Sequence, residues 1–517
     1  NGADALAIGD SANSTGTSST SVGGESVANG TAATSFGWRA NASAERAHAL
    51  GHLANASGVR SLAVGEAASA SGEASVAQGN QAVASGTNSI AIGNTAEASG
   101  GDSIAIGGNR DGAGGRATVA SGPSTTAVGG QAIANGPGAT TFGWRAEANA
   151  ERATALGHLA TAQGVRSTAV GENADAQTDF ATAIGNESIA NGTDALAVGD
   201  SASSTGTSTT AVGGESVANG TAATSFGWRA NATGERAHAF GHLASAQGDF
   251  SMAIGENAQA QSANATAIGN QSVASGADAL AIGDSASSTG TSSTSVGGES
   301  VANGTAATSF GWQAQATAER AHALGHLANA SGVRSLAVGE AAAASGDGSV
   351  AVGDRASVTA SNSVALGAGS VANEADVVSV GAAGSERRIT NVAAGVNATD
   401  AVNVAQMMAM TSSFDDGTGT DSAQFGDSAN AAGAGATAIG DNAEASGEEA
   451  TAIGVRASAS NTGAIALGAD ADSSGVDSIA FGDAAVASGP STTAVGGESV
   501  AMGPGASAIG WQAMASA

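Results

Sequence analysis

Apolar residues recur along the chain just before a glycine that returns every 14 residues. The register runs through three stretches of sequence, from Gly9 to Gly107, from Gly129 to Gly381 and from Gly426 to Gly510. Glycine- and alanine-rich segments are often disordered linkers, but a disordered linker does not keep a fixed period over hundreds of residues. The pattern therefore predicts a repeat protein built from 14-residue units.

Each unit reads as two short strands joined by turns. The residue before the glycine and the one two places earlier are usually large, with a small residue between them, as in Leu62-Ala63-Val64. Small residues alternate in the same way after the glycine, as at Ala68 and Ala70. Alternation with period 2 is typical of β-strands. A coiled coil, whose heptads would also fit a 14-residue period, is disfavoured because each glycine would cost a helix about 1 kcal/mol.

A coil of two five-residue strands encloses little space, so only the small residues fit inside it. The larger residues must then point outward and form an apolar stripe along the whole stack, which needs a partner surface. Closed symmetry around one long axis makes a homotrimer the natural partner arrangement. The sequence therefore predicts an all-β fold, a parallel β-roll whose three copies share a central core.

The composition excludes several functional classes. The net charge is −29 and the basic residues are 16 scattered arginines, which argues against nucleic acid as a partner. Cysteine is absent, so disulfides and thiolate metal sites are excluded, and we expect no metal and no cofactor. The sequence shows no signal peptide and no run of 18 apolar residues, and it begins and ends inside a repeat, so we expect a fragment whose membrane anchor lies elsewhere.

The repeats carry a family resemblance. Units such as Ser89-Ile90-Ala91-Ile92-Gly93-Asn94-Thr95-Ala96-Glu97-Ala98-Ser99-Gly100 resemble the head repeats of YadA-like trimeric autotransporter adhesins. The segment ERRITNVAAGVNATDAVNVAQM, residues 386–407, resembles the neck of that family. The resemblance implies a left-handed parallel β-roll, intertwined as a homotrimer and displayed on the surface of a Gram-negative bacterium.

The same resemblance suggests the domain organisation. We expect a head over residues 1–384, a neck over 385–410 and a second head over 411–517. In such necks an arginine and an aspartate pair between chains, and the matching residues here are Arg387 or Arg388 and Asp400. One departure is that no heptad stalk follows the neck, because the chain turns polar and then re-enters the 14-residue register at Gly426.

Unusual residues stack at the turn position directly after the periodic glycine. Equivalent positions lie one coil apart, so each set of three should form a ladder on one edge. This edge is either a platform for a sugar or peptide ring, or a brace in which stacking and a His–Glu hydrogen bond hold the turns together. The first two ladders are Trp38, His52 and Glu66, and then Trp144, His158 and Glu172. The third and fourth are Trp228, His242 and Glu256, and then Trp312, His326 and Glu340.

Polar residues also interrupt the apolar stripe. His48, His238 and His322 take stripe positions, and trimer symmetry would arrange each as a ring of three imidazoles. Such a ring would hold an anion or a metal, or it would be a packed neutral layer. Gln78 would form a similar ring, which we interpret as a structural or water-binding layer.

An insertion between Gly107 and Gly129 makes one coil eight residues longer than the others. We expect a loop near residues 108–124 that protrudes from the rod, with Asn109, Arg110, Asp111 and Arg116 as its polar groups. Loops of this kind often carry binding residues, although a purely structural role is the simpler interpretation.

Catalysis finds no support, because the acidic residues lie at repeated turn positions rather than in a pocket. The leading hypothesis is an adhesin head that attaches to host matrix, to cells or to surfaces, or to like fibres on other cells, through many repeated weak sites. A passive spacer that carries a distal tip is the alternative. An ice-binding β-solenoid is a weaker one, because the threonine series from Thr126 to Thr182 falls in the stripe assigned to the trimer core.

Overall fold

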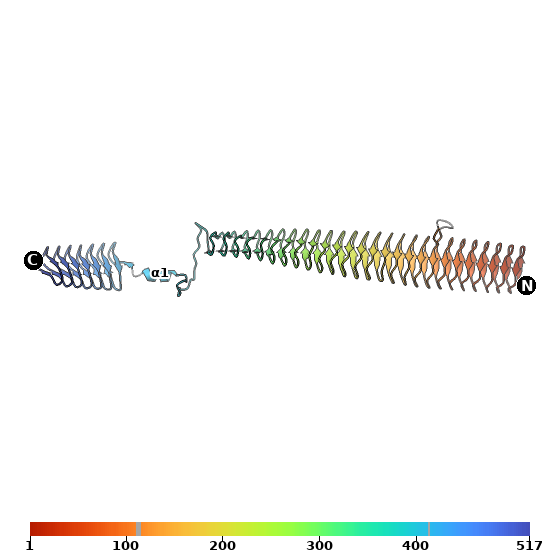
Figure 1. Ribbon diagram of the computed structural model, residues 1–517, viewed down its shortest axis with the longest axis horizontal. Coiled ribbons are helices and arrows are strands. Elements are labelled where there is room, and N and C mark those ends of the chain that lie inside the picture. Colours follow the sequence, from red (N-terminus) through yellow and green to blue (C-terminus); the bar gives the residue numbers. More distant parts are fainter. Residues whose placement is uncertain (110–114, 412–413, 517) are drawn as a thin grey trace. The chain divides into compact units, whose positions relative to one another are not determined.

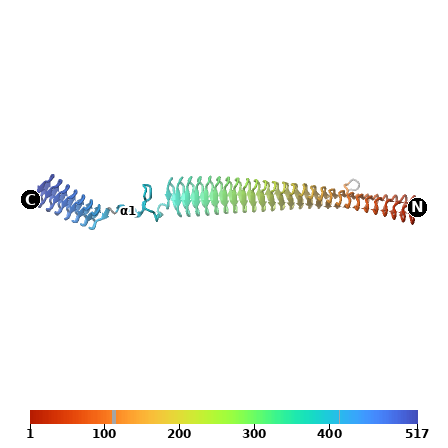
Figure 2. The ribbon, with the colours of Figure 1, turned by 90° about the horizontal axis from the view of Figure 1, so that it is seen from below.

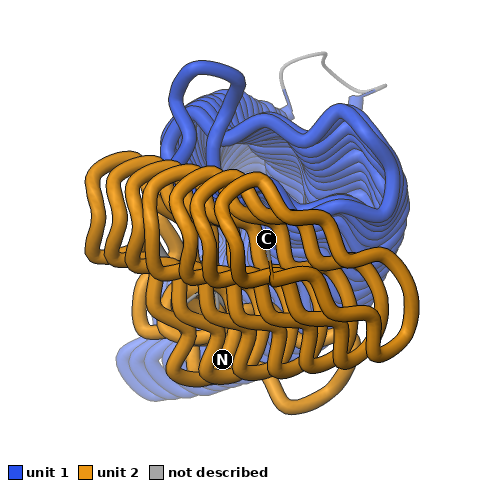
Figure 3. The backbone as a smooth tube through the Cα atoms, turned by 90° about the vertical axis from the view of Figure 1, so that its left-hand side faces the viewer, with its two compact units in different colours: residues 1–387 blue, residues 388–517 orange. Residues whose placement is uncertain are grey.

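The computed structural model describes residues 1–109, 115–411 and 414–516. The chain divides into two compact units, residues 1–387 and residues 388–517. The first unit is a long stack of narrow coils (Figures 1 and 2). The second unit also contains a stack of coils, seen end-on in Figure 3.

Two parallel sheets run the length of the first unit. Sheet 1 contains 27 strands, the odd-numbered ones from β1 (Leu6–Ile8) to β53 (Val378–Ser379). Sheet 2 contains the even-numbered strands from β2 (Asn13–Ser14) to β52 (Val371–Ala372). This arrangement confirms the predicted all-β parallel solenoid.

The pairing register follows the 14-residue period. In β1 and β3 (Thr20–Val22), Leu6 pairs with Thr20 and Ile8 with Val22. Strands of sheet 1 have three residues except β53, and strands of sheet 2 have two, so both are shorter than the five residues expected from the sequence. The strands are shorter because two turns, each with a left-handed residue, take up the rest of every coil.

The turns depend on backbone conformations that most residues avoid. Gly65 has a φ of 129°, and two non-glycine residues near it, Arg60 and Ala67, have φ values of 60° and 52°. A left-handed residue costs roughly 1–2 kcal/mol. Each of the three also donates a backbone hydrogen bond to the preceding coil, such as Ala67 N to His52 O at 2.7 Å. The stacking of coils thus stabilises turns that an isolated coil would not hold.

Close approach between coils explains the periodic glycine. A Cβ atom added at Gly65 would lie 2.4 Å from the carbonyl oxygen of Gly79, one coil further on. No real Cβ contact is that short, so any side chain here would push two coils apart.

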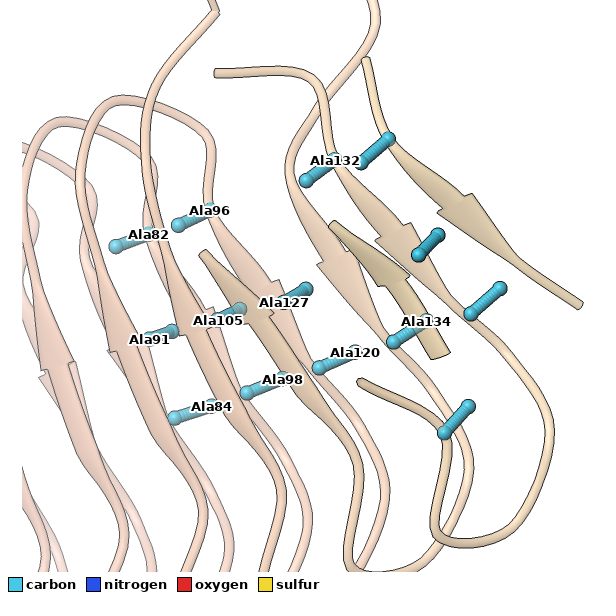
Figure 4. Close-up of a cluster of buried hydrophobic side chains, with 14 of the residues drawn as sticks. Ala82, Ala84, Ala91, Ala96, Ala98, Ala105, Ala120, Ala127, Ala132 and Ala134 are labelled. Carbon is cyan, nitrogen blue, oxygen red and sulfur yellow. The ribbon is translucent and has the colours of Figure 1, made fainter. Parts of the chain in front are cut away.

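The interior of the roll consists almost entirely of alanine and serine. Figure 4 shows alanines that successive coils place in this interior. Ala84, Ala98 and Ala120 belong to sheet 2, and Ala91 and Ala105 belong to sheet 1. All five are fully buried. The two sheets therefore face each other across a layer of small side chains, as the sequence predicts.

Large apolar residues lie outside this layer, on the outer face of sheet 1. Phe36, Phe142, Phe226 and Phe310 are 54–56% exposed in the single chain. We call the outward-pointing residues of sheet 1 the apolar stripe. Its exposure leaves a surface that a second copy of the chain can cover.

The insertion does not interrupt the stack. It lies between β15 (Ile104–Ile106) and β16 (Val119–Ala120). β15 still pairs in parallel with β17 (Thr126–Val128), one coil further on. Arg110 and Asp111, which the sequence suggests as polar groups of the loop, lie outside the described residues.

The second unit begins with an irregular segment and helix α1 (Val404–Thr411). Strand β54 (Phe414–Asp416) pairs antiparallel with β55 (Ala423–Phe425). From there the odd-numbered strands stack in parallel to β67 (Ser507–Ile509). The even-numbered strands form a second sheet, from β56 (Asn430–Ala431) to β68 (Met514–Ala515).

The close approach of coils makes the periodic glycines sensitive to substitution. We expect Gly65→Ala to lower the free energy of unfolding by at least about 2 kcal/mol, because the new methyl group meets the Gly79 carbonyl and the backbone is strained. Chemical denaturation followed by circular dichroism measures this. Gly369→Ala is the matched control, because a Cβ there meets nothing within 4 Å and φ is +67°. Equal losses in the two variants would contradict the explanation.

Candidate functional site

Each ladder of tryptophan, histidine and glutamate lies on the turn that follows sheet 1. In the first ladder the rings of Trp38 and His52 stack with centroids 4.8 Å apart and an interplanar angle of 24°. His52 Nδ1 lies 3.5 Å from a carboxylate oxygen of Glu66. Register pairing between coils places these three residues directly above one another.

The second ladder has the same geometry. Trp144 and His158 stack with ring centroids 4.8 Å apart. His158 Nδ1 lies 3.1 Å from a carboxylate oxygen of Glu172, within hydrogen-bond distance. The sequence predicts one column with a His–Glu hydrogen bond, and His158 and Glu172 have this geometry.

The third and fourth ladders repeat the arrangement. Trp228 stacks on His242 at 4.9 Å, and His242 Nδ1 lies 3.3 Å from Glu256. In the fourth ladder the Trp312 and His326 rings are 5.0 Å apart. His326 Nδ1 lies 3.6 Å from a carboxylate oxygen of Glu340, which is longer than a hydrogen bond. The structure thus brings each set of three residues together.

A glycine that sequence reasoning missed lies beside the indole on the coil that precedes it. Gly24 precedes Trp38 by one coil, and a Cβ added there would lie 3.0 Å from Trp38 Cδ1. The paired glycines of the Val-Gly-Gly segments signal this in the sequence, because the second glycine makes room for the ring of the next coil. Those in the same relation to the other three tryptophans are Gly130, Gly214 and Gly298.

An arginine next to the tryptophan completes the first ladder. The Arg39 guanidinium lies over the Trp38 ring, 5.1 Å from its centroid, and forms a 3.3 Å ion pair with Glu25. The fourth ladder has Gln313 instead, and its side chain donates a 2.7 Å hydrogen bond to Glu299. The interaction between coils is kept although the charge is lost.

The contacts of the ladder reach both faces of the indole. Trp38 is 45% exposed, but one face meets His52 and the other lies against the Gly24 turn. A sugar or peptide ring needs an open aromatic face. These contacts support the brace interpretation of the ladders, and binding of a ligand there stays a prediction.

The polar residues of the stripe lie on the outer face of sheet 1. His48 pairs in register with Thr34 and Leu62, both of which are stripe residues. His238 stacks on Phe240 of its own strand at 6.2 Å, and His322 occupies the equivalent place in β45 (His322–Leu324). Whether they form rings depends on the arrangement of the three copies and stays a prediction.

Gln78 lies in the same face, at the end of β11 (Val76–Gln78), between Val64 and Ile92 of the adjacent coils. It is exposed in the single chain. A polar layer at this level of the trimer is likewise a prediction.

Within one chain, the arginine and the aspartate expected to pair in the neck form hydrogen bonds with other groups. Arg387 donates to Ser370 Oγ at 2.8 Å and to the carbonyl oxygen of Val380 at 2.9 Å, at the end of the first roll. Asp400 accepts from the backbone N–H groups of Asn397 and Val396, and these bonds lower the pKa of its carboxyl group. Arg388 is exposed, and pairing between chains stays a prediction.

The described residues of the insertion are anchored on the roll. Arg116 forms an ion pair with Glu147, which lies two coils beyond the insertion. Asn109 donates a 2.8 Å hydrogen bond to the Gly115 carbonyl, and the Gln131 backbone N–H donates to Thr118 Oγ1 at 3.1 Å. These contacts fix the base of the loop to the stack.

Within the described part of a single chain, no group of three or more His, Asp or Glu side chains is arranged to hold a metal ion. Among the same residues, no helix is long and apolar enough to cross a membrane.

The brace interpretation predicts a local loss of stability. His242→Ala should remove both the stack on Trp228 and the 3.3 Å contact with Glu256, and should lower the opening free energy of the neighbouring coils by about 1 kcal/mol. Hydrogen exchange of the backbone amides around Gly241 measures it.

A control for this prediction lies in the same column, two coils further on. Asn270→Ala leaves the ladder intact and removes only an exposed hydrogen bond to Asp284, so exchange around Gly241 should change little. An unchanged exchange rate in His242→Ala would argue against a brace.

Comparison with known proteins places the chain in a family. The YadA head domain repeat matches in successive segments between residues 1 and 383, and again over 445–471 and 473–499. The model for the coiled stalk of trimeric autotransporter adhesins matches residues 388–431. No curated protein matches the chain.

One similar solved structure is the collagen-binding domain of the Yersinia adhesin YadA. The identity is 22%, the match covers 48% of this chain and 85% of that chain, and the TM-score is 0.13. The head repeats themselves cover well over half of the present sequence. These repeats are parts of adhesins and not of enzymes, and the chain belongs to the YadA head-repeat family of trimeric autotransporter adhesins.

Proposed function

We propose that this chain is the head region of a bacterial surface adhesin. Three copies bury their apolar stripes along a common axis, and the outer faces of the rod attach to host matrix, to other cells or to surfaces. The observation that carries this proposal is the stripe, a long row of mostly apolar side chains that are half-buried or exposed in the single chain, in a family that is trimeric. A matching anchor in the outer membrane of a Gram-negative cell would display the rod.

The stripe supports a trimer through its energetics. Burial of apolar area contributes about 25 cal/mol per Å². A half-exposed phenylalanine or isoleucine in every few coils, repeated along a sheet of 27 strands, supplies a large total even though each coil adds little. The stability of the trimer therefore comes from the number of coils that bury apolar area, and each coil contributes little by itself.

The face used for the trimer also bears on ice binding. Thr126, Thr140 and Thr154 are the first residues of their strands in sheet 1, on the same face as the apolar stripe. In a trimer this threonine series is buried, so no row of threonines on this face remains exposed to bind ice.

The spacer hypothesis draws support from the repeated blocks. Residues 1–72 nearly match residues 275–346, and the stacking distances of the four ladders agree closely. A rod that changes length by whole blocks suits a stalk-like role. An adhesive rod and a spacer differ in whether the outer faces bind anything.

Trimer formation is tested first by the solution mass from light scattering. We expect three times the chain mass of 48.2 kDa. The double variant Ile90→Glu, Ile92→Glu should lower the midpoint of thermal dissociation, because it places carboxylates in the stripe. Val83→Glu is the control, since Val83 lies on sheet 2 in the column that carries Glu97. A monomer of 48.2 kDa would contradict the shared core.

Adhesion is tested with beads that carry the trimer at graded density. We expect attachment to collagen-coated glass, epithelial cells or polystyrene to rise more steeply than density, because repeated weak contacts act together. Beads coated with an inert protein of similar charge are the control. Attachment to none of the three surfaces would favour the spacer function.

A further inference from the structure

One column of the first unit excludes charge completely. The position six residues after the periodic glycine is Ser, Thr, Asn or Gln in every coil from Thr15 to Asn373. The insertion shifts the spacing by eight residues, and the corresponding position, Ser121, obeys the same rule. We call this set the neutral column.

Turn chemistry does not explain the exclusion. Asp serves turns as well as Asn does, yet Asn stands in the neutral column at Asn29, Asn135 and Asn219 while Asp never does. Gln has no turn preference, but it occurs at Gln163 and Gln247 where Glu never occurs. The chain holds 45 acidic residues in all, so their absence from this column is a selection against charge.

The fold keeps the neutral column away from the trimer core. In β4 (Val27–Ala28) the Ala28 side chain is buried, so alternation places Val27 and Asn29 on the outer face of sheet 2. The apolar stripe lies on the outer face of sheet 1, across the alanine layer. The neutral column therefore remains open to solvent when the stripes of three copies meet.

The side chains of this column form a hydrogen-bonding surface with spare capacity. Thr15 Oγ1 donates to Asn29 Oδ1 at 2.8 Å, and Ser121 Oγ donates to Asn135 Oδ1 at 2.9 Å. An amide has two donors and two lone pairs, and a hydroxyl both donates and accepts, so these bonds leave groups free for a partner.

A second column flanks the neutral one on the same face and is mostly apolar or neutral. It contains branched apolar residues such as Val83 and Ile189. Its acidic members are Glu97, Glu147 and Asp175, and Glu147 is paired with Arg116. The face therefore combines neutral hydrogen-bonding groups with short apolar side chains.

We propose that this face of the first unit binds neutral polysaccharide, with one chain lying along the rod. Hydroxyl groups both donate and accept, as every side chain of the neutral column does, and the sugar rings offer CH surfaces to the flanking valines and isoleucines. Coils about 4.8 Å apart repeat at close to the length of one pyranose unit. A charge buried under such a ligand would lack a partner, which accounts for its exclusion.

Other partners fit the charges less well. An anionic polymer would be repelled by a chain of net charge −29. A second rod would bring its own acidic columns close, such as the one that contains Glu45 and Glu73. A neutral polymer meets neither obstacle. The inference rests on the proposed adhesive function and names a ligand class for it.

Retention of the intact trimer on cellulose, chitin and insoluble amylose tests the inference. We expect binding to at least one, nearly unchanged between low and high salt because no ion pairs are involved. A fourfold variant should bind at least about tenfold more weakly, since it sets carboxylates in well-separated coils of the column. Its substitutions are Ser43→Asp, Ser71→Asp, Ser99→Asp and Asn135→Asp.

The control variant adds the same charge at the opposite turn and should bind normally. Its substitutions, Ser11→Asp, Asn173→Asp, Ser201→Asp and Ser285→Asp, fall on the turn that follows sheet 1, in a column that already carries Glu187 and Glu215. Light scattering and thermal unfolding establish that both variants remain folded trimers.

Several outcomes overturn the inference. The inference is wrong if the trimer is retained on none of the three polysaccharides. It is also wrong if both variants bind polysaccharide equally weakly. Retention on collagen or cells without retention on polysaccharide would leave the adhesive function intact and reject only this ligand class. Self-association that the first variant alone abolishes would assign the face to a second rod instead.

Discussion

The narrow interior of the coil is the constraint on which the rest of the structure depends. Strands of three and two residues leave room between the sheets for little beyond Ala and Ser, so the larger side chains are forced outward. A globular protein of this length would bury its aromatic residues in a core of its own. This chain instead exposes phenylalanines such as Phe36 and Phe310 and needs other copies to cover them.

The sequence predicts most of this fold because the stacking repeats the same local choice in every coil. Leu62-Ala63-Val64 already shows which residues face in and which face out. The pattern overestimates strand length, because the left-handed residues of the turns, such as Arg60, carry no distinctive side chain. The period alone does not identify Gly24 as part of the ladder, because its role depends on the width of an indole one coil away.

For the ladders, the sequence leaves two interpretations open, a ligand platform and a structural brace, and the geometry of the side chains favours the brace. The order Trp38, His52, Glu66 along one column is readable from the period. The sequence does not show how far the indole faces are open, because that depends on contacts with His52 and Gly24 of the neighbouring coils and on the position of the Arg39 side chain. Contacts on both faces favour a brace within the rod, and binding of a ligand at the ladder stays a prediction. The neck pair and the histidine rings depend on contacts beyond one chain, so they stay predictions.

Stacking in register places equivalent positions of successive coils in columns along the rod. A binding site on such a rod can therefore be a whole column of similar side chains. In a pocket, a few residues converge on one ligand. Along this rod a column such as the one from Thr15 to Asn373 offers the same weak contact in each coil, and affinity grows with the length engaged. Single substitutions in such a strip remove one contact among many, so function resides in the column and only changes repeated over several coils can reveal it.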